Sequence, residues 1–288
     1  MTVLLVASAE DPASTHIKNG LLDLFSWKEE GMFYQTPVFR SNDLVMVTIP
    51  DKKIRHENID VEVREQLQIQ PRIAIFLSRH RSKVGDPTLT VHPIGNFNKA
   101  EFGGRPQTLI PCAPRMMACL LRLIKKHLAQ TDLAFQVCYE VTHHGPYLEI
   151  PTLFAEVGST EEQWKQPEPA KVIALALHEM LSHYRYEEEF STDIPVLVGV
   201  GGGHYAPRFT DLVFEKNIAF GHMLPTYHIE ESGIDPMMLE KALAATPNVH
   251  GAYLNKKALK KSQVRELKNW FSGRGVPVVS SAELPVLL

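Results

Sequence analysis

Cysteine is scarce in this 288-residue chain, and its spacing excludes two kinds of structure. The three cysteines are Cys112, Cys119 and Cys138, an odd count with no Cys-x-x-Cys pair. This pattern argues against a disulfide framework and against a zinc site built from thiolates. A metal site in this protein would therefore use nitrogen and oxygen ligands.

Long apolar runs and an excess of positive charge are also missing. No run approaches the roughly 18 apolar residues that a membrane span requires. The apolar stretch at residues 3–7 is short and lacks basic residues before it, so it predicts a strand and not a signal peptide. We expect a cytoplasmic protein without membrane contact. The formal net charge of −3, from 30 Lys and Arg against 33 Asp and Glu, excludes a uniformly basic nucleic-acid binder but not a local basic patch.

Several catalytic motifs are absent. The chain has neither a Gly-x-Ser-x-Gly elbow nor a His-Glu-x-x-His helix, so serine hydrolysis and zincin chemistry lack support. The glycine-rich segment at 199–207 is neither a P-loop nor a Gly-x-Gly-x-x-Gly fingerprint, because His204 stands where the last glycine belongs. We therefore expect no nucleotide cofactor.

Short β-branched runs alternate with helical patterns along the whole chain. Strands are predicted at residues 2–7, 38–40, 44–49, 72–77, 134–142, 148–157, 194–200, 218–220, 252–254 and 276–279. Residues 78–111 are predicted to form a long functional loop. No repeat or linker divides the chain, so residues 1–288 are expected to form a single α/β domain. Its central sheet should be mixed, largely parallel and flanked by helices.

Histidine is the unusual residue, with 13 copies. His80, the pair His143 and His144, His204 and His222 each follow a predicted strand. Ligands of open α/β sheets bind at the carboxyl ends of the strands. If the strands are parallel, these histidines should therefore line one cleft.

The segment CYEVTHHGP at 138–146 carries the sharpest signal. On an extended strand Glu140, Thr142 and His144 would share one face, with His143 on the other. Glu140 and His144 could then hold a metal ion or act as an acid and base. A buried Glu–His pair without a catalytic role is the structural alternative.

Two further segments suit a phosphate or a developing negative charge. Amides of Gly201, Gly202 and Gly203 could face an oxyanion or a terminal phosphate, although a tight turn would also explain three glycines. The loop SRHRSK at 78–83 places Arg79, Arg81 and Lys83 beside the expected site. A second basic stripe, at residues 256–268, would be a solvated helix face or a contact for nucleic acid.

These segments together resemble the archaeal-type D-aminoacyl-tRNA deacylase family, which plants share. The resemblance rests on SRHRSK (78–83), LTVHPIGN (89–96), CYEVTHHGP (138–146), EIPTLFAEVGSTEEQW (149–164), GVGGGHYAP (199–207) and AFGHMLPTY (219–227). It spans essentially the whole chain and is strongest over residues 72–227.

The resemblance implies hydrolysis of the ester between a D-amino acid and the 3′-terminal adenosine of tRNA. It also implies a zinc cofactor, a cytosolic location and a fold like those of phosphorylases and peptidyl-tRNA hydrolases. We expect a monomer with tRNA as its partner. The expected catalytic residues are Glu140, His144, His80 and His204. The expected metal ligands come from His143, His144, His204 and His222. The expected substrate-binding residues are Arg79, Arg81, Lys83, His92, Asn96, Thr142, Gly201, Gly202, Gly203 and Tyr205.

Two other functions remain compatible with the residues. A metal-dependent amidohydrolase or aminopeptidase would cleave small amides without tRNA. A nucleic-acid or nucleoside binding module with structural histidines would bind tRNA ends and turn nothing over.

Overall fold

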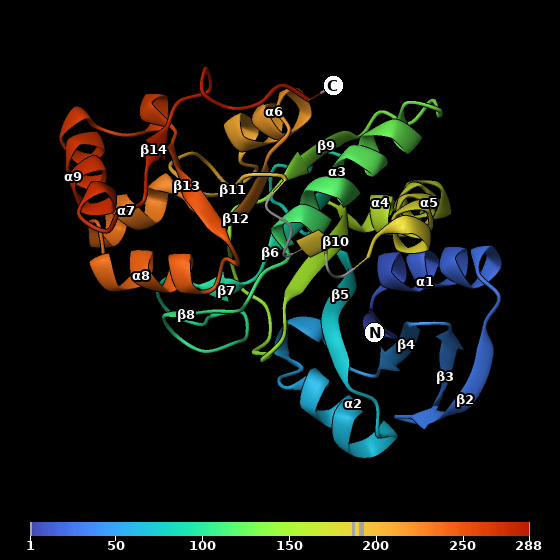
Figure 1. The fold of residues 1–288 in the computed structure, drawn as a ribbon. Helices are drawn as coiled ribbons and strands as arrows, with labels where there is room; N and C mark the ends of the chain where they lie inside the picture. The colour runs from blue at the N-terminus through green and yellow to red at the C-terminus, as the bar shows by residue number, and fades with distance from the viewer. Residues whose placement is uncertain (1, 186–187, 190–192, 288) are drawn as a thin grey trace.

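A large mixed sheet forms the framework of the N-terminal two thirds of the molecule (Figure 1). The computed structural model describes residues 2–185, 188–189 and 193–287. The eight strands, in spatial order, are β2 (Lys28–Phe33), β3 (Thr36–Ser41), β4 (Leu44–Ile49), β1 (Thr2–Ser8), β5 (Pro71–Arg79), β10 (Thr152–Gly158), β6 (Thr88–Pro93) and β9 (Gln136–Tyr139). Strands β4, β1, β5 and β10 are mutually parallel, whereas β3, β6 and β9 run in the opposite direction.

A second, smaller sheet lies in the C-terminal part, drawn in orange and red in Figure 1. It is wholly parallel, with the order β12 (Ala219–Leu224), β11 (Val196–Val200), β13 (Val249–Leu254) and β14 (Val278–Val279). A two-stranded ribbon joins β7 (Gly95–Asn96) to β8 (Thr108–Leu109). The predicted α/β class with a mixed, largely parallel sheet is confirmed, and this second sheet is an addition to it.

Helices cover the two sheets unequally. One apolar core joins the first sheet to α1 (Pro12–Leu24), α3 (Pro114–Leu128) and α5 (Pro167–His183), and it continues into the second sheet through α6 (Pro207–Glu215). The opposite face of the first sheet packs on α2 (Ile59–Leu67). The remaining helices are α4 (Glu161–Trp164), α7 (Thr226–Ser232), α8 (Pro236–Ala244) and α9 (Lys261–Ser272), with short 3-10 turns η1 (Lys53–Arg55) and η3 (Lys256–Ala258). None of the helices in the described ranges combines the length and apolarity needed to cross a membrane.

The side-chain alternation of three neighbouring strands places polar groups on the α2 face. Phe76 and Phe154 stack in the core on that face, with ring centroids 4.6 Å apart. Two residues further along each strand, Ser78 and Glu156 are register partners, and Thr90 of β6 pairs with Glu156 from the other side. Because strand residues two apart share a face, this face changes from apolar to polar near the carboxyl end of β5.

The predictions for the segment 78–111 and for the lengths of two strands are wrong. Residues 78–111 were expected to form a loop, but they contain β6, whose residues are all buried within the sheet, and the β7–β8 ribbon. The strands expected at 134–142 and 148–157 are shorter, at Gln136–Tyr139 and Thr152–Gly158. β2 was not predicted, because its sequence KEEGMF is charged, contains glycine and is mostly exposed.

A buried ion pair fixes the carboxyl ends of β1 and β5. Lys53 Nζ contacts Asp11 Oδ2, and both side chains are almost completely buried. Asp11 also accepts the backbone N–H of Arg79 at 2.8 Å and that of Ser14 at 3.1 Å. One carboxylate thus joins α1, β5 and η1.

We expect Lys53→Met to lower the free energy of unfolding by about 3 kcal/mol, because Asp11 would become a buried carboxylate without its cation. Arg40→Met is the control, since Arg40 pairs with Glu30 at 3.4 Å on the surface, and a loss below about 1 kcal/mol is expected there. Urea unfolding measures both changes. If both variants lose the same small amount of unfolding free energy, the buried pair of Lys53 and Asp11 contributes no more than a surface pair.

Candidate active site

A cleft of about 1440 Å³ runs over the polar part of the sheet. One wall is basic and comes from η1 with the residue before it, and from the end of β5 with the segment after it; we call Lys52, Arg55, Arg79, Arg81 and Lys83 the basic wall. The other wall comes from α7 and the segment after β7. It includes Phe97, Asn98, Tyr227 and His228. The side chains between the two walls are His80, His143, His144, Glu156 and His204.

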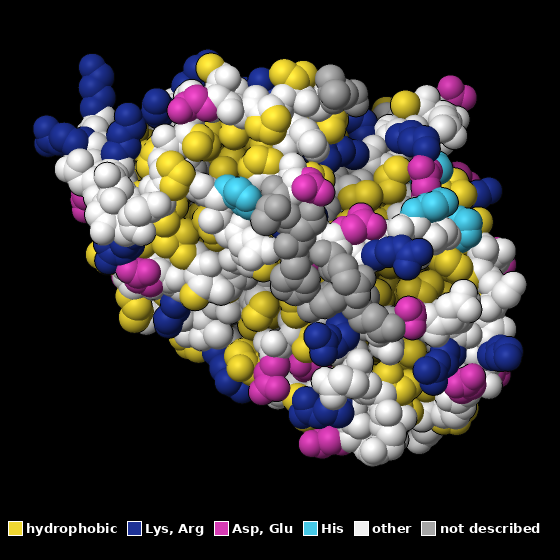
Figure 2. Space-filling view, viewed as in Figure 1, with side chains coloured by type: hydrophobic (Ala, Val, Ile, Leu, Met, Phe, Trp, Pro, Cys, Tyr) yellow, Lys and Arg dark blue, Asp and Glu magenta, His cyan; other side chains and the backbone are white. Residues whose placement is uncertain are grey.

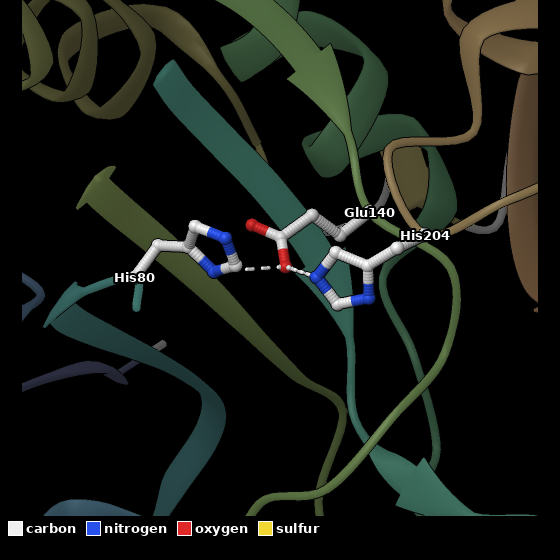
Figure 3. A group of neighbouring side chains, drawn as sticks. All are labelled: His80, Glu140 and His204. Carbon is white, nitrogen blue, oxygen red and sulfur yellow. Dashed lines mark ion pairs between the residues drawn. The ribbon is translucent and has the colours of Figure 1, made fainter. Parts of the chain in front are cut away.

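The carboxylate of Glu140 is the centre of the histidine cluster. Its Oε2 lies 2.8 Å from His204 Nε2, 3.2 Å from His80 Nδ1 and 3.3 Å from His143 Nε2. Figure 3 shows His80 and His204 on either side of this oxygen. Glu140 is fully buried, yet neither of its oxygens accepts a hydrogen bond of acceptable geometry. A buried carboxylate in this state requires a compensating positive charge.

Backbone carbonyls hold Nδ1 of two imidazoles. Nδ1 of His143 lies 2.8 Å from the carbonyl oxygen of Val141, and Nδ1 of His92 lies 3.1 Å from that of Pro93. Burial lowers the pKa of His143 well below its usual value, so this ring is neutral and directs its Nε2 lone pair toward Glu140, whereas Glu156 outweighs burial and raises the pKa of His92. Histidines that ligate metals usually donate their other N–H in this way.

A second buried glutamate reinforces the negative charge. Glu156 Oε2 lies 3.5 Å from His80 Nδ1 and 3.7 Å from His92 Nε2. Its other oxygen accepts a short hydrogen bond from Ser78. The sequence reasoning missed Glu156. The available signal was a lone glutamate in the otherwise apolar strand TLFAEVG, where an acid is costly unless it has a partner.

Burial and charge shift the pKa values in opposite directions across the cluster. Burial alone raises the pKa of Glu140, but His80 and His204 outweigh burial and hold it well below its usual value. Burial lowers the pKa of His80, but the Glu140 and Glu156 carboxylates outweigh burial and raise it to about 11. Burial, followed by the charge of His92, lowers the pKa of His144 to about 4. Glu140 is therefore ionised and His144 neutral at pH 7.

The chain around Glu140 departs from the expected strand alternation. Glu140 still donates its N–H to the carbonyl of Val91 in β6, but Val141 donates to the carbonyl of His204. The chain pairs again only at His143, which forms an isolated bridge with Ile94 just after β6. His144 has φ of +21°. Because the strand ends at Tyr139, Glu140 approaches His143, and among the described residues it pairs with His80, His143 and His204 but not with His144. The expected direct pairing of Glu140 with His144 is therefore wrong, although His144 lines the cleft.

The convergence of the histidines also has a different cause from the one expected. β9 is antiparallel to β5 and β10, and β11 belongs to the second sheet. His80, His143 and His204 therefore meet between the two sheets and not along one parallel edge. His204 is carried there by the loop after β11, whose Tyr205 hydroxyl lies 3.2 Å from His80 Nε2. Tyr205 thus orients His80, whereas we had expected it to contact the substrate.

His222 does not join this cluster. It is fully buried and is not among the residues that line the cleft. Its Nδ1 lies 3.0 Å from Thr142 Oγ1 and its Nε2 lies 3.0 Å from the carbonyl oxygen of Ile110. Because both ring nitrogens are engaged, the expected role of His222 as a metal ligand is wrong. Thr142 is also fully buried and bonds to His222 and Met223, so its expected substrate contact is wrong too.

Two backbone amides of the glycine loop already donate hydrogen bonds within the protein. The N–H of Gly201 donates to the carbonyl of Leu224 at 2.8 Å, and the N–H of Gly202 donates to Thr226 Oγ1 at 2.8 Å. These two amides cannot serve an oxyanion, and Gly203 does not line the cleft. The positive φ angles of Gly201 and Gly202 instead form the turn that presents His204.

The remaining predicted residues divide between the cleft and its support. Arg79, Arg81 and Lys83 line the cleft, as expected from the sequence. Asn96 also lines it, but its amide donates to the carbonyl of Gly103 at 2.9 Å and so holds a loop. His92 is completely buried beneath the cleft and contacts Glu156. The expected substrate contact of His92 is therefore wrong.

Comparisons with known proteins identify similar chains over most of the length. A family described as D-aminoacyl-tRNA deacylase matches residues 67–279. A D-aminoacyl-tRNA deacylase of Pyrococcus horikoshii is 39% identical over 226 residues, which are 78% of this chain and 80% of that protein. One of Methanosarcina barkeri is 34% identical over 289 residues, covering 98% of this chain and 90% of that protein.

A solved structure has the same fold over the full length. It is the crystal structure of a conserved protein of unknown function, with a TM-score of 0.88, 29% sequence identity and 99% coverage of both chains. The two-sheet architecture is therefore shared with that protein.

We expect His222→Phe to lower the free energy of unfolding by about 2 kcal/mol, because Ile110 and Thr142 would lose a buried hydrogen-bond partner. The variant should keep kcat nearly unchanged, since His222 does not reach the cleft. His183→Ala is the control, because His183 is exposed at the end of α5. Normal stability combined with a large loss of kcat would contradict a structural role for His222.

Proposed function

Because the chain belongs to the D-aminoacyl-tRNA deacylase family, we propose that its histidine-lined cleft is where the ester bond of D-aminoacyl-tRNA is cleaved. The protein is a hydrolase that releases free D-amino acid and tRNA. The observation that carries the proposed site is the buried carboxylate of Glu140 among His80, His143 and His204. The family favours this reaction over the amidohydrolase or aminopeptidase alternative.

The charge distribution of the cleft suits this substrate. Ester hydrolysis needs a water molecule that loses a proton and a donor that stabilises the developing oxyanion. The histidines and glutamates supply groups for the first task. The basic wall supplies cations for the phosphates near the 3′ end of tRNA.

We propose zinc as the cofactor, held by His80, Glu140 and His204. The ligand atoms of these three residues lie within 4.8 Å of one another, and His92, Glu140 and His143 form a second such set that shares Glu140. The orphaned Glu140 oxygens and the nitrogen and oxygen donors fit zinc. We favour the first set because His80 and His204 line the cleft. A bound zinc ion would polarise the ester carbonyl and lower the pKa of a nearby water to about 7.

His144 is the proposed proton acceptor. It lines the cleft, and its lowered pKa keeps the ring neutral at pH 7. In this scheme the proton of water passes to His144 while the water oxygen bonds to the ester carbonyl carbon. The bond to the ribose oxygen then breaks, and that oxygen receives the proton.

Tyr227 is the proposed oxyanion donor. Its side chain lines the cleft and is 40% exposed. Burial, followed by the charge of Glu140, raises the pKa of its hydroxyl to about 12. The hydroxyl therefore stays protonated and can donate a hydrogen bond, a role that Gly201 and Gly202 cannot fill.

We further propose that the enzyme acts as a cytoplasmic monomer without a nucleotide cofactor.

The second basic stripe has exposed side chains at Lys257, Lys261, Arg265 and Lys268. Lys and Arg side chains project over the α9 end of the molecule in Figure 2. The stripe lies outside the cleft. A contact with the acceptor stem therefore stays a prediction.

We expect zinc removal by a chelator to abolish turnover and zinc addition to restore it. Glu140→Gln should lower the zinc content measured by elemental analysis, because it removes the carboxylate that would bind zinc together with His80 and His204. The control is His183→Ala, which lies outside the cluster and should keep its zinc. Full turnover by enzyme shown to be metal-free would leave the histidines with proton-transfer roles only.

We expect Tyr227→Phe to lower kcat by about 100-fold with little change in KM, because an oxyanion donor acts mainly in the transition state. Tyr34→Phe is the matched control, since the Tyr34 hydroxyl bonds to Glu62 on the surface. Single-turnover hydrolysis of D-aminoacyl-tRNA measures both variants. An unchanged kcat for Tyr227→Phe would exclude this donor.

A further inference from the structure

The loop at residues 97–107 crosses from one wall of the cleft to the other. At the α7 wall, Asn98 Nδ2 donates to Ser232 Oγ at 2.9 Å and to Glu231 at 3.3 Å. At the far end, the N–H of Gly104 donates to Glu57 Oε1 at 2.7 Å. The guanidinium of Arg105 lies 3.5 Å from the ring centroid of Tyr147. The loop is therefore fixed at both ends.

Gly103 brings the loop against the backbone of η1. It has φ of +98°, and a Cβ atom at this position would lie 1.5 Å from the carbonyl oxygen of Ile54. No other residue fits such an approach without moving one of the two segments. The residue before Gly103 is thus held near η1, whose Arg55 belongs to the basic wall; a Cβ atom at Gly103 would lie 3.4 Å from Arg55 Cα.

That residue is Phe102, a large apolar side chain left in water. It is 57% exposed, lines the cleft, and its ring centroid lies 6.4 Å from that of His144. The loop's anchors hold this ring over the cleft, although burying it elsewhere would be favourable. An exposed aromatic ring beside cations matches a nucleotide, which presents a base for stacking and phosphates for ion pairing.

We propose that Phe102 is the stacking platform for the base of the 3′-terminal nucleotide of tRNA, with the neighbouring phosphates on Lys52 and Arg55. This inference rests on the proposed function, because it assigns one part of the same substrate. The aminoacyl group then extends from the ribose past His144 toward Glu140 and Tyr227. Phe102 contributes to binding and takes no part in the proton transfers.

A pair of RNA hairpins tests this assignment directly. Both mimic the acceptor end, one with a 3′-terminal adenosine and the other with an abasic ribose at that position. Wild-type protein should bind the adenosine hairpin more tightly. Phe102→Ala should weaken binding of the adenosine hairpin by about 5- to 150-fold and leave binding of the abasic hairpin unchanged. Phe102→Trp should retain the preference.

Two control variants separate stacking from charge and from surface effects. Lys52→Gln should weaken both hairpins equally, because a phosphate contact does not depend on the base. Met32→Ala, on the exposed edge strand β2, should change neither. Since Phe102 is largely exposed, thermal unfolding of Phe102→Ala should match that of wild type.

Three binding results would overturn the inference: no loss with Phe102→Ala, the same loss for both hairpins, or no wild-type preference for adenosine. A loss of kcat/KM that appears only with bulky D-amino acids would also overturn it, because it would assign Phe102 to the aminoacyl side chain. Turnover of D-aminoacyl-tRNA by wild type is measured in parallel. Base-dependent binding without turnover would count against the proposed function and leave this inference standing.

Discussion

The carboxylate of Glu140 imposes the main constraint on this structure, because it is a fully buried charge whose oxygens accept no hydrogen bond of acceptable geometry. Such a charge is tolerated only beside compensating positive charge. Its neighbours come from distant parts of the chain: His80 after β5, His143 after β9 and His204 after β11. The cluster therefore exists only when the two sheets are docked. Glu156 adds a second negative charge, so the site requires a cation, and His80, whose pKa is raised to about 11, supplies one when it is protonated.

Hydrogen bonds between the two sheets keep that docking in register. Val141 donates to the carbonyl of His204, and Thr142 exchanges bonds with Met223 across the junction. His222 completes this junction by joining Thr142 to the loop before α3. Of these contacts, the bond between Val141 and His204 lies next to the site and keeps Glu140 Oε2 and His204 Nε2 within 2.8 Å of each other, whereas His222 contributes to stability. A site formed between two sheets needs such a junction, since an error of about 1 Å in position is costly for catalysis.

Local patterns predicted the α/β class, most strands and the gathering of His80, His144 and His204 in one cleft, though not the absence of His222 from it. They failed where the result depends on pairing between distant segments. The antiparallel direction of β6 and β9 cannot be read from apolar runs, because both directions bury the same side chains. The amides of Gly201 and Gly202 looked free for an anion, but their partners Leu224 and Thr226 lie on another strand and helix. Glu156 was readable in principle, since an acid inside an apolar strand signals a buried partner.

The positive charges of the cleft are concentrated on the basic wall, so the two sides of the cleft suit different parts of a substrate. The chain has a formal net charge of −3, so a polyanionic substrate is not attracted by the protein as a whole. The cations of the basic wall lie at one side, whereas Glu140 and Glu156 lie beneath the histidines. Protonated His80 compensates part of the charge of Glu140 and Glu156, so the cations of the basic wall are the strongest attraction for phosphates in the cleft. In the proposed complex the tRNA backbone therefore lies toward Lys52 and Arg79, and the ester lies toward Glu140.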